Sequence, residues 1–580
     1  MRKSNKFFSV LMVGLLCLVA FGKVAADTRS DLFFKVLGDE VQRNMSQLVM
    51  EKLERPYFIS YTIDDIQQLE VSASLGQLLR SQLERSRYLT TDLRVGNYSL
   101  DNSNFVSGFS GMGPDFAALP VDDDYDAIRN DVYLATDQAY KAALESLSKK
   151  RAYLQSRVIP DRADDHIKFS ANKFLDKPEE FDIEAGFFEE LAKPMSEVFR
   201  TYPAIISSEL NVTASVVNQY LVNSEGTQTL RGDRIYGFSL SMAGRSADGE
   251  DVVNSDRIIV NDLKQLPARE ALIAWTKANA EKMNRMIAAD TLEDYIGPAL
   301  FAGDAAGEFL RQLFSRNVSN LPGPTYENDQ MNSMMGGGSD FANKLNRRVL
   351  PTTMNVYNDP TLEKIGDTPL IGSYEVDDAG NPPKRTTLVE NGKLVNFLIA
   401  TAPTKKVKES NGSARGAVSK GVTAKPSNLI FESTDKITPE KLKKNLIAMC
   451  KDIDLPYGIM ITKIRDMGQS SGGFQMFGQQ LSGGSSDAGV TDPYEITRIY
   501  ADGREEPIRG LQFTDVNARI LRDIVMTDNS RYVYNYLIGN DYEMPATIVT
   551  PSLLIEEMEL KKIDSKVKKP PVLPSPLAGQ

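Results

Sequence analysis

The chain has 580 residues, of which 41% are hydrophobic and 25% are charged. This length allows roughly two to four domains, and the composition is that of a soluble folded protein, which excludes wholesale disorder and a multi-span membrane protein. Asp and Glu number 78 against 67 Lys and Arg, a net charge of −11 that repels phosphate backbones, so no nucleic-acid partner is expected. His166 is the single histidine. Any mechanism that needs two histidines is therefore excluded.

The N-terminus predicts export. Basic residues precede a 15-residue apolar run, Phe7–Phe21, and small residues follow at 24–26, the pattern of a secretory signal peptide over 1–26 that is cleaved near Ala26. The run is shorter than the ~20 residues of a permanent span, so no stable membrane span is expected. Cys17 follows the bulky Leu16, which argues against lipoprotein processing. The exported protein, periplasmic or secreted, would carry a net charge of −15 and a single cysteine, Cys450, predicted to be a buried thiol.

The first half of the chain predicts a mixed α/β domain over residues 27–290. Apolar periodicity favours helices over Asp31–Leu53, Leu75–Glu84, Asp124–Val158, Gly186–Thr201 and Ala268–Ala288. Tyr57–Ile63 and Tyr88–Tyr98 are typical of strands, and Ile205–Ser241 of an antiparallel meander with turns at Gly226 and Gly232. Trp275, the only tryptophan, is expected in the core.

Four aspartates at the start of the long predicted helix, at positions 122, 123, 124 and 126, superficially have the spacing of a calcium loop. That loop also needs a glycine at its sixth position and a glutamate at its twelfth, where this chain has Ala127 and Tyr133. We therefore interpret these carboxylates as favourable charges at a helix N-terminus.

The second half predicts a β-rich domain over 291–560, followed by a tail over 561–580 that is too rich in Lys and Pro to build a core. Its predicted strands are Leu370–Val376, Thr386–Ala400, Gly458–Ile464, and a hairpin of Ile496–Tyr500 with Pro507–Leu511. Thr438 and Pro439 have the chemistry of a helix start. The Gly- and Ser-rich stretches Met331–Ser339 and Gly468–Gly489 are expected to be mobile unless something docks on them.

Two patterns could signal catalysis. Gly468–Gly472 matches Gly-x-Ser-x-Gly, but Gly and Ser follow it where a nucleophile elbow requires a helix, and the only possible base, His166, lies about 300 residues earlier. A flexible loop is the favoured interpretation. His166 follows Asp164 and Asp165, which predicts a surface histidine beside carboxylates, and one histidine cannot anchor a typical zinc site.

Longer strings in the second half resemble a known family. Glu375–Leu394, with Val-Asp-Asp-Ala-Gly-Asn-Pro followed by Arg-Thr-Thr-Leu-Val-Glu-Asn-Gly, is similar to a hairpin segment of the TldD/PmbA (TldE) metallopeptidases. Glu495–Gly510 is similar to a second hairpin of that family, and Pro551–Leu560 to its closing strand. The resemblance covers Tyr295–Leu560 and extends loosely to Tyr220–Thr227. It implies an α+β, two-domain TldD/PmbA-like fold.

In TldD-type members a helix carries His-Glu-x-x-x-His, and a later cysteine completes a zinc site. The resemblance places that helix here at Phe301, with Gly303 and Glu308 where the histidines would stand and Asp304 in place of the glutamate. Tyr536–Glu543 offers no cysteine. We therefore predict no catalytic residue, no metal site and no cofactor, with Asp304 and Glu308 as solvated helix acids. A hard cation between these carboxylates is the alternative.

The resemblance implies a noncatalytic subunit that binds peptides or a partner. The PmbA (TldE) branch also lacks the histidines and pairs with TldD, so a homo- or heterodimer is expected. Extended peptide could add to strands near Thr386–Ala400 and Glu495–Tyr500, with Gly468–Gly489 as a flap or only a surface insertion. Two alternatives stay open: an active hydrolase with a diverged metal site, and a cell-envelope scaffold.

Overall fold

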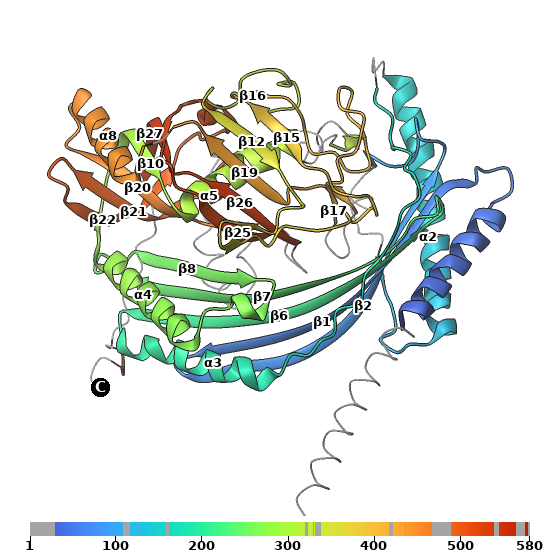
Figure 1. Ribbon diagram of the computed structural model, residues 1–580, viewed down its shortest axis with the longest axis horizontal. Coiled ribbons are helices and arrows are strands. Elements are labelled where there is room, and N and C mark those ends of the chain that lie inside the picture. The colour runs from blue at the N-terminus through green and yellow to red at the C-terminus, as the bar shows by residue number, and fades with distance from the viewer. Residues whose placement is uncertain are drawn as a thin grey trace, which may run out of the picture.

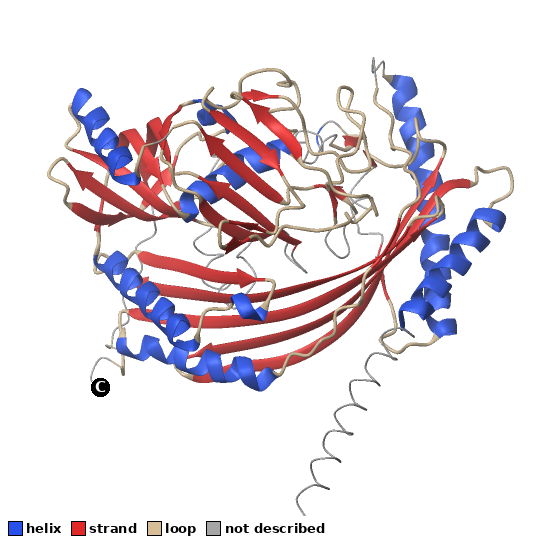
Figure 2. Cartoon of the chain, viewed as in Figure 1, coloured by secondary structure: helices blue, strands red, loops and turns tan. Residues whose placement is uncertain are grey.

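The computed structural model describes residues 29–107, 116–157, 162–319, 323–328, 330, 338–416, 421–435, 437–466, 489–538, 544–563, 573 and 575–577. A long, curved sheet from the N-terminal half supports a second, two-sheet body from the C-terminal half (Figure 1). Figure 2 shows that helices cover the outer face of the curved sheet, whereas the other body lies on its inner face. The fold is α+β, as predicted.

The curved sheet is built around two antiparallel hairpins, β1–β2 and β6–β7, joined by pairing of β1 with β6. Along β1, odd-numbered residues such as Ile59, Tyr61 and Val71 are buried under the helices, and even-numbered ones such as Ser60 and Thr62 point to the inner face. In order across the sheet, the strands are β4 (Phe116–Ala118), β2 (Gln77–Val95), β1 (Pro56–Ser74), β6 (Ile205–Asn223), β7 (Gln228–Arg245) and β5 (Lys173–Leu175). A further strand, β8 (Asp251–Val260), also pairs with β7.

The predicted helix over Leu75–Glu84 is wrong. Leu75 and Gly76 form the turn of the β1–β2 hairpin, both with positive φ (50° and 80°), and β2 starts at Gln77. The leucines at 75, 79 and 83 have helical spacing, but the residues from Gln77 onward, apart from the bulged Leu79, gain cross-strand partners on β1, and this pairing overrides the local pattern. The hairpin joins two predicted strands into a much longer pair.

One predicted turn in the meander is also wrong. Gly226 does turn the chain between β6 and β7, with φ of 90°. Gly232 instead lies inside β7 opposite Asn218, and its missing side chain leaves room for Glu179: a Cβ there would lie 2.5 Å from the Glu179 Cγ. This glycine serves close packing.

Helices over residues 29–47 and in α2 (Tyr125–Ser156) cover one end of the outer face, and α3 (Ala185–Glu197) and α4 (Arg269–Ala288) cover the other. All four were predicted, with ends shifted by a few residues. Asp124 caps α2 by accepting the Ala127 N–H (2.8 Å), and Asp123 pairs with Arg29 and Arg87. Single turns η2 (Val198–Thr201) and η3 (Leu263–Gln265) lie near α3 and α4.

The C-terminal body holds two sheets. The eight-stranded one, with β24 (Ile524–Thr527) beside β27, has the order β23 (Leu511–Phe513), β27 (Leu553–Lys562), β10 (Asp294–Phe301), β20 (Tyr457–Ile464), β21 (Pro493–Tyr500), β22 (Glu505–Arg509) and β9 (Asp290–Thr291). The six-stranded one has the order β16 (Lys393–Leu394), β15 (Thr386–Glu390), β12 (Met354–Asn358), β19 (Asn428–Ser433), β26 (Met544–Thr550) and β25 (Tyr532–Ile538). The remaining short pairs are β3 (Phe105–Val106) with β11 (Thr325–Tyr326), β13 (Lys364–Ile365) with β14 (Thr368–Pro369), and β17 (Ala414–Arg415) with β18 (Thr423–Ala424).

A continuous helical segment is buried in the core that these two sheets share. It consists of α5 (Asp304–Leu310), the π-helical turn η4 (Arg311–Ser315) and α6 (Arg316–Val318), and the core contains residues of α5 and of both sheets. On the outside of the eight-stranded sheet, α8 (Pro439–Asp452) begins at the predicted Thr438 cap and buries Cys450, as predicted. The short turn η5 (Ala518–Arg522) completes the body.

Several strand predictions in this half need correction. Residues 370–376 form no strand because their N–H groups bond to scattered acceptors, such as Thr547 Oγ1 for Ile371. Within Thr386–Ala400 only β15 and β16 are strands. β15 and β21 belong to different sheets, and β21 is paired on both sides, so they do not offer one common peptide-binding edge. The strand Gly458–Ile464 and the hairpin β21–β22 are confirmed.

The predicted signal peptide over 1–26 lies outside the described residues, as do 331–337, most of Gly468–Gly489, and most of the predicted tail. Lys561 and Lys562 at the start of that tail belong to β27, because they pair with Asp294 on β10 and with β23. Among the helices described, none is both long and apolar enough to cross a membrane.

Candidate functional site

The helix singled out by the resemblance, α5, begins at Asp304 rather than Phe301. Phe301 ends β10, and Gly303 occupies the N-cap position with φ 59° and ψ −135°. That conformation is open to glycine and strained for any residue with a Cβ. Gly303 therefore makes the sharp change of direction between strand and helix.

Glu308 is buried, with 1% of its surface exposed, so its prediction as a solvated acid is wrong. Its carboxylate accepts two hydrogen bonds of 2.6 Å from Arg311, one of 2.5 Å from Gln312 and one of 2.8 Å from Tyr534. Burial raises the pKa of Glu308, and the positive charge of Arg311 opposes that shift. The guanidinium of Arg311 also donates to Asp466 (3.0 Å).

Asp304 and Glu308 both line a small hollow of about 220 Å³ between the curved sheet and the C-terminal body. Asp304 accepts a hydrogen bond from Tyr532 (2.5 Å) and lies 3.6 Å from Lys463. Lys463 makes a shorter ion pair, 2.6 Å, with Asp256 on β8, and Trp275 Nε1 donates to that same aspartate. The tryptophan is half-buried and packs against the core that was predicted to contain it, and it also supports an ion pair between the two halves.

These residues do not fit a zinc ion. Gly303 has no ligand atom, and the Glu308 oxygens are engaged by Arg311, Gln312 and Tyr534. Zinc needs several imidazole, thiolate or carboxylate ligands that converge on one point. In the part of the chain that the structure describes, no group of three or more His, Cys, Asp or Glu side chains is arranged to hold a metal.

The loop that carries the Val-Asp-Asp string, residues 375–385, anchors the C-terminal body to the curved sheet. Asp378 pairs with Arg231 of β7 (2.7 Å). Asp377 accepts backbone N–H bonds from Ala379, Asn381 and Ala414. Burial raises the pKa of Asp377 to about 7, although these N–H donors act in the opposite direction.

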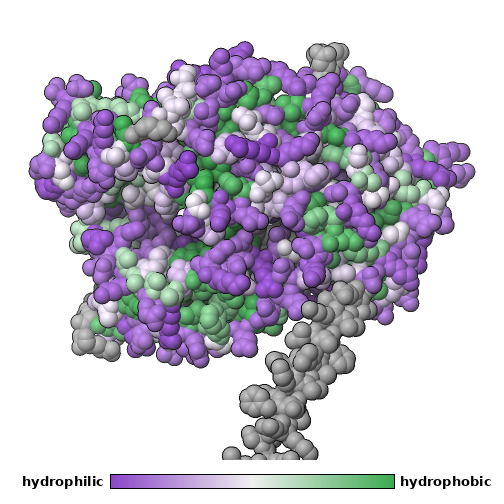
Figure 3. Space-filling view, viewed as in Figure 1, coloured by the Kyte–Doolittle hydropathy of each residue, from purple (hydrophilic) through white to green (hydrophobic). Residues whose placement is uncertain are grey.

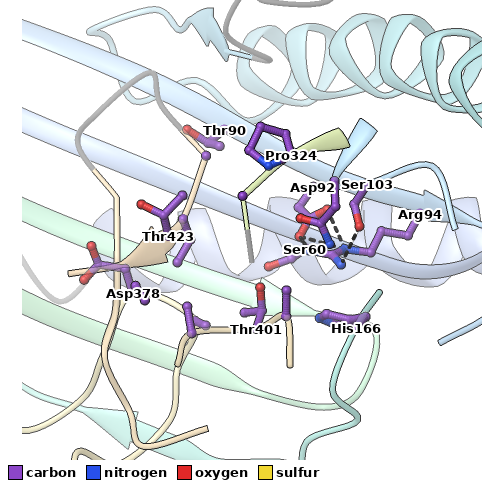
Figure 4. A pocket seen from close by; sticks show the side chains of 18 of the residues that line it. Ser60, Thr90, Asp92, Arg94, Ser103, His166, Pro324, Asp378, Thr401 and Thr423 are labelled. Atoms are coloured by element: carbon purple, nitrogen blue, oxygen red, sulfur yellow. Dashed lines mark hydrogen bonds and ion pairs between the residues drawn. The ribbon is translucent and has the colours of Figure 1, made fainter. Parts of the chain in front are cut away.

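A cavity of about 720 Å³ lies between the inner face of the curved sheet and the C-terminal body. Ser60 of β1 and Thr90 of β2 line one wall, and Thr401 and Thr423 line the other (Figure 4). Thr62 of β1 also lines the cavity. Across the described residues, none of these five hydroxyl groups forms a hydrogen bond with the protein.

The outer surface shows hydrophilic side chains over most of the face in view, with smaller hydrophobic areas between them (Figure 3).

His166 lines this cavity and is 3% exposed, so its prediction as a surface histidine is wrong. Its ring lies against Tyr98, Phe58 and Phe169, with centroids 5.8, 4.9 and 6.0 Å away. Burial, together with the positive charge of Arg94, lowers the pKa of His166 to about 2, so the imidazole is neutral. Its Nδ1 has no hydrogen-bond partner in the described structure.

The charges beside His166 are paired. The Arg94 guanidinium donates to both oxygens of Asp92 at 2.9 Å and to Asp101 at 3.4 Å. Across the cavity, Asp378 is held by Arg231 and by Arg415 (3.4 Å). The part of the cavity wall around His166 and Asp378 is thus close to electrically neutral.

Residues 297–562 match the family described as "PmbA/TldA metallopeptidase C-terminal domain". This segment of the chain is thus similar to the C-terminal domain of the PmbA/TldD family. The segment begins near the start of β10 and ends with β27, so α5 and the Val-Asp-Asp loop both lie inside it.

Solved structures share the fold of nearly the whole chain. TldE from Thermococcus kodakarensis is 12% identical, with a TM-score of 0.56 over 90% of this chain and 99% of that one. A Bacteroides thetaiotaomicron VPI-5482 protein, described as a candidate modulator of DNA gyrase, is 13% identical with a TM-score of 0.57 over 92% and 98%. A Thermotoga maritima MSB8 protein described in similar terms is 14% identical, with a TM-score of 0.54 over 87% and 96%. No curated protein matches the chain.

The sequence predicted a helix here, starting at Phe301 instead of Asp304, but not the partners of its acids. Arg311, three residues after Glu308, was a visible signal, since that spacing places two side chains on one face of a helix. Tyr534 and Asp466 come from distant segments, and no pattern in the sequence connects them to α5. The Gly468–Gly472 motif lies outside the described residues.

Proposed function

We propose that this protein is a noncatalytic, exported member of the TldD/PmbA family that acts as a peptide-binding or partner subunit. The observation that carries the proposal is the pairing of Glu308 with Arg311. A carboxylate closed by a bidentate guanidinium, an amide and a phenol cannot ligate a catalytic metal or activate a water without breaking that network. Gly303 adds no ligand.

Peptide or partner binding is compatible with loss of the metal, because main-chain and side-chain hydrogen bonds do not depend on it. The inner face of the curved sheet and the C-terminal body together enclose a cavity large enough for a small ligand. Native mass spectrometry of the purified protein reports its oligomeric state and any bound metal in one measurement.

The test of the proposed function is a cleavage assay on a fluorescence-quenched peptide library, with and without added zinc, and with a known zinc peptidase as positive control. We expect no cleavage above background and far less than one zinc per chain. Stoichiometric zinc together with chelator-sensitive cleavage would show that an active, diverged metallopeptidase is the correct reading. Export is tested separately: the amino terminus of the mature protein should begin at or near Asp27.

A further inference from the structure

The cavity between the two halves has the chemistry of a binding site. Buried polar groups normally find hydrogen-bond partners, because an unpaired one costs free energy. Here the nine-tenths-buried His166 leaves Nδ1 unpaired. The half-buried or exposed hydroxyl groups of both walls are also without protein partners among the described residues, so they are free to bind water or a ligand.

The wall residues limit the charge of that ligand. Asp92 and Asp378 are each already paired with arginine, and the imidazole is neutral. Arg316 in α6 lines the cavity at an exposed position, and its guanidinium makes no hydrogen bond or ion pair within the described structure. One cation without a partner favours a ligand with one negative charge.

The arrangement of hydroxyl groups and aromatic rings in the wall favours the C-terminal end of a peptide as the ligand. Neighbouring strands present hydroxyls from one face, since Thr62 of β1 stands directly opposite Thr90 of β2. Thr401 and Thr423 lie on the facing wall. Such groups can donate to and accept from alternating backbone C=O and N–H groups, and Phe58 and Phe169 add apolar contact.

We propose that this cavity binds a short peptide by its free C-terminal carboxylate, with Arg316 as the partner of the carboxylate and the hydroxyls of both walls as partners of the backbone. The inference rests on the peptide-binding role proposed above and gives it a location and a polarity. It places the peptide away from α5, between β1, β2 and the C-terminal body.

The test uses two probes, a randomised N-acetyl tetrapeptide mixture with free carboxylates and the same mixture as C-terminal amides. Each is incubated with the full mature chain, and the retained peptides are counted by mass spectrometry. We expect the carboxylate mixture to be retained roughly ten- to hundredfold better, the effect of one hydrogen-bonded charge. Arg316→Gln should abolish that preference, whereas Arg522→Gln, an exposed arginine on η5, should keep it.

NMR of His166 reports independently where the peptide binds. The chain has a single histidine, so if the purification tag contains none, the imidazole resonances of the sample come from this ring alone. Selective ¹³C labelling of this ring should show a shift with the carboxylate mixture that is lost in Arg316→Gln. Retention without an imidazole shift, or unchanged retention by Arg316→Gln, would overturn the cavity assignment and leave the proposed function standing. N-acetylalanine serves as a third probe, and if it binds as well as the tetrapeptides, the cavity would be assigned to small carboxylic acids instead.

No retention of either mixture would overturn both the cavity assignment and the peptide-binding role. Zinc-dependent cleavage would overturn the noncatalytic role alone. Thr62→Val, which keeps the shape and removes a hydroxyl, should weaken retention roughly two- to tenfold without loss of folding, as checked by thermal unfolding.

Discussion

Arg311 lies three residues after Glu308 and holds its buried carboxylate with two hydrogen bonds of 2.6 Å. The pair occupies the helix on which the family resemblance places the catalytic motif. The carboxylate of Glu308 is thereby closed by the chain's own cation.

Removing Arg311 should be far more harmful than removing the charge of Glu308. Arg311→Met leaves a buried carboxylate without its cation, which costs about 3 kcal/mol or more. Glu308→Gln leaves Arg311 paired with Asp466, so a smaller loss is expected. Urea unfolding of both variants measures the difference. Lys149→Met, which breaks an exposed pair with Glu145 on α2, is the control and should leave the midpoint unchanged. Equal losses for the two network variants would contradict the assignment.

Restoring histidines should not restore a zinc site. In Gly303→His a side chain must adopt φ 59°, at a cost of roughly 1 to 3 kcal/mol. In Glu308→His the new imidazole faces the Arg311 cation, which disfavours a bound metal. The double variant should be less stable than the parent and contain no stoichiometric zinc by elemental analysis. One bound zinc per chain in that variant would refute this account of the site.

His166 should make stability depend on pH. Its pKa falls from 6.5 in the unfolded chain to about 2 in the folded one, so the unfolded state binds more protons below pH 6.5 and stability falls as the pH is lowered. Between pH 7 and pH 5 the wild type should lose about 2 kcal/mol relative to His166→Phe. Chemical denaturation at both pH values measures this. Because both proteins contain the same other titratable groups, including Asp377, the contributions of those groups to the pH dependence cancel in the comparison. A pH-independent difference between the two proteins would mean that the imidazole is not buried.

Gly307 should not tolerate a methyl group. A Cβ there would lie 2.5 Å from the Tyr534 Cβ, because α5 packs directly on β25. Gly307→Ala should destabilise the protein by about 1 to 3 kcal/mol through overpacking. Gly186→Ala on α3, where a Cβ meets nothing within 4 Å, is the matched control and should be neutral or slightly stabilising. Thermal unfolding distinguishes them, and equal melting temperatures would contradict the packing of α5 on β25.

The secondary-structure elements that could be predicted from the sequence are those that local residue patterns determine. The α2 and α8 helices follow from apolar periodicity and from the caps Asp124 and Thr438. The hairpin at Leu75 was missed because its strand character comes from pairing with β1, not from local preference. His166 was misplaced for a similar reason: Phe58 and Tyr98 come from segments far away in the chain, and only the fold brings them to the ring.

The ion pairs that join the two halves limit how this chain can vary. Arg231 meets Asp378, Arg257 meets Asp466 at 2.6 Å, and Asp256 meets Lys463, each with one partner from either half. A buried charge that loses its partner is costly, whereas a simultaneous change of both partners can be neutral. Substitutions at these positions should therefore occur in pairs. A chimera that joins this curved sheet to the C-terminal body of a distant relative should fold each half and fail to dock them.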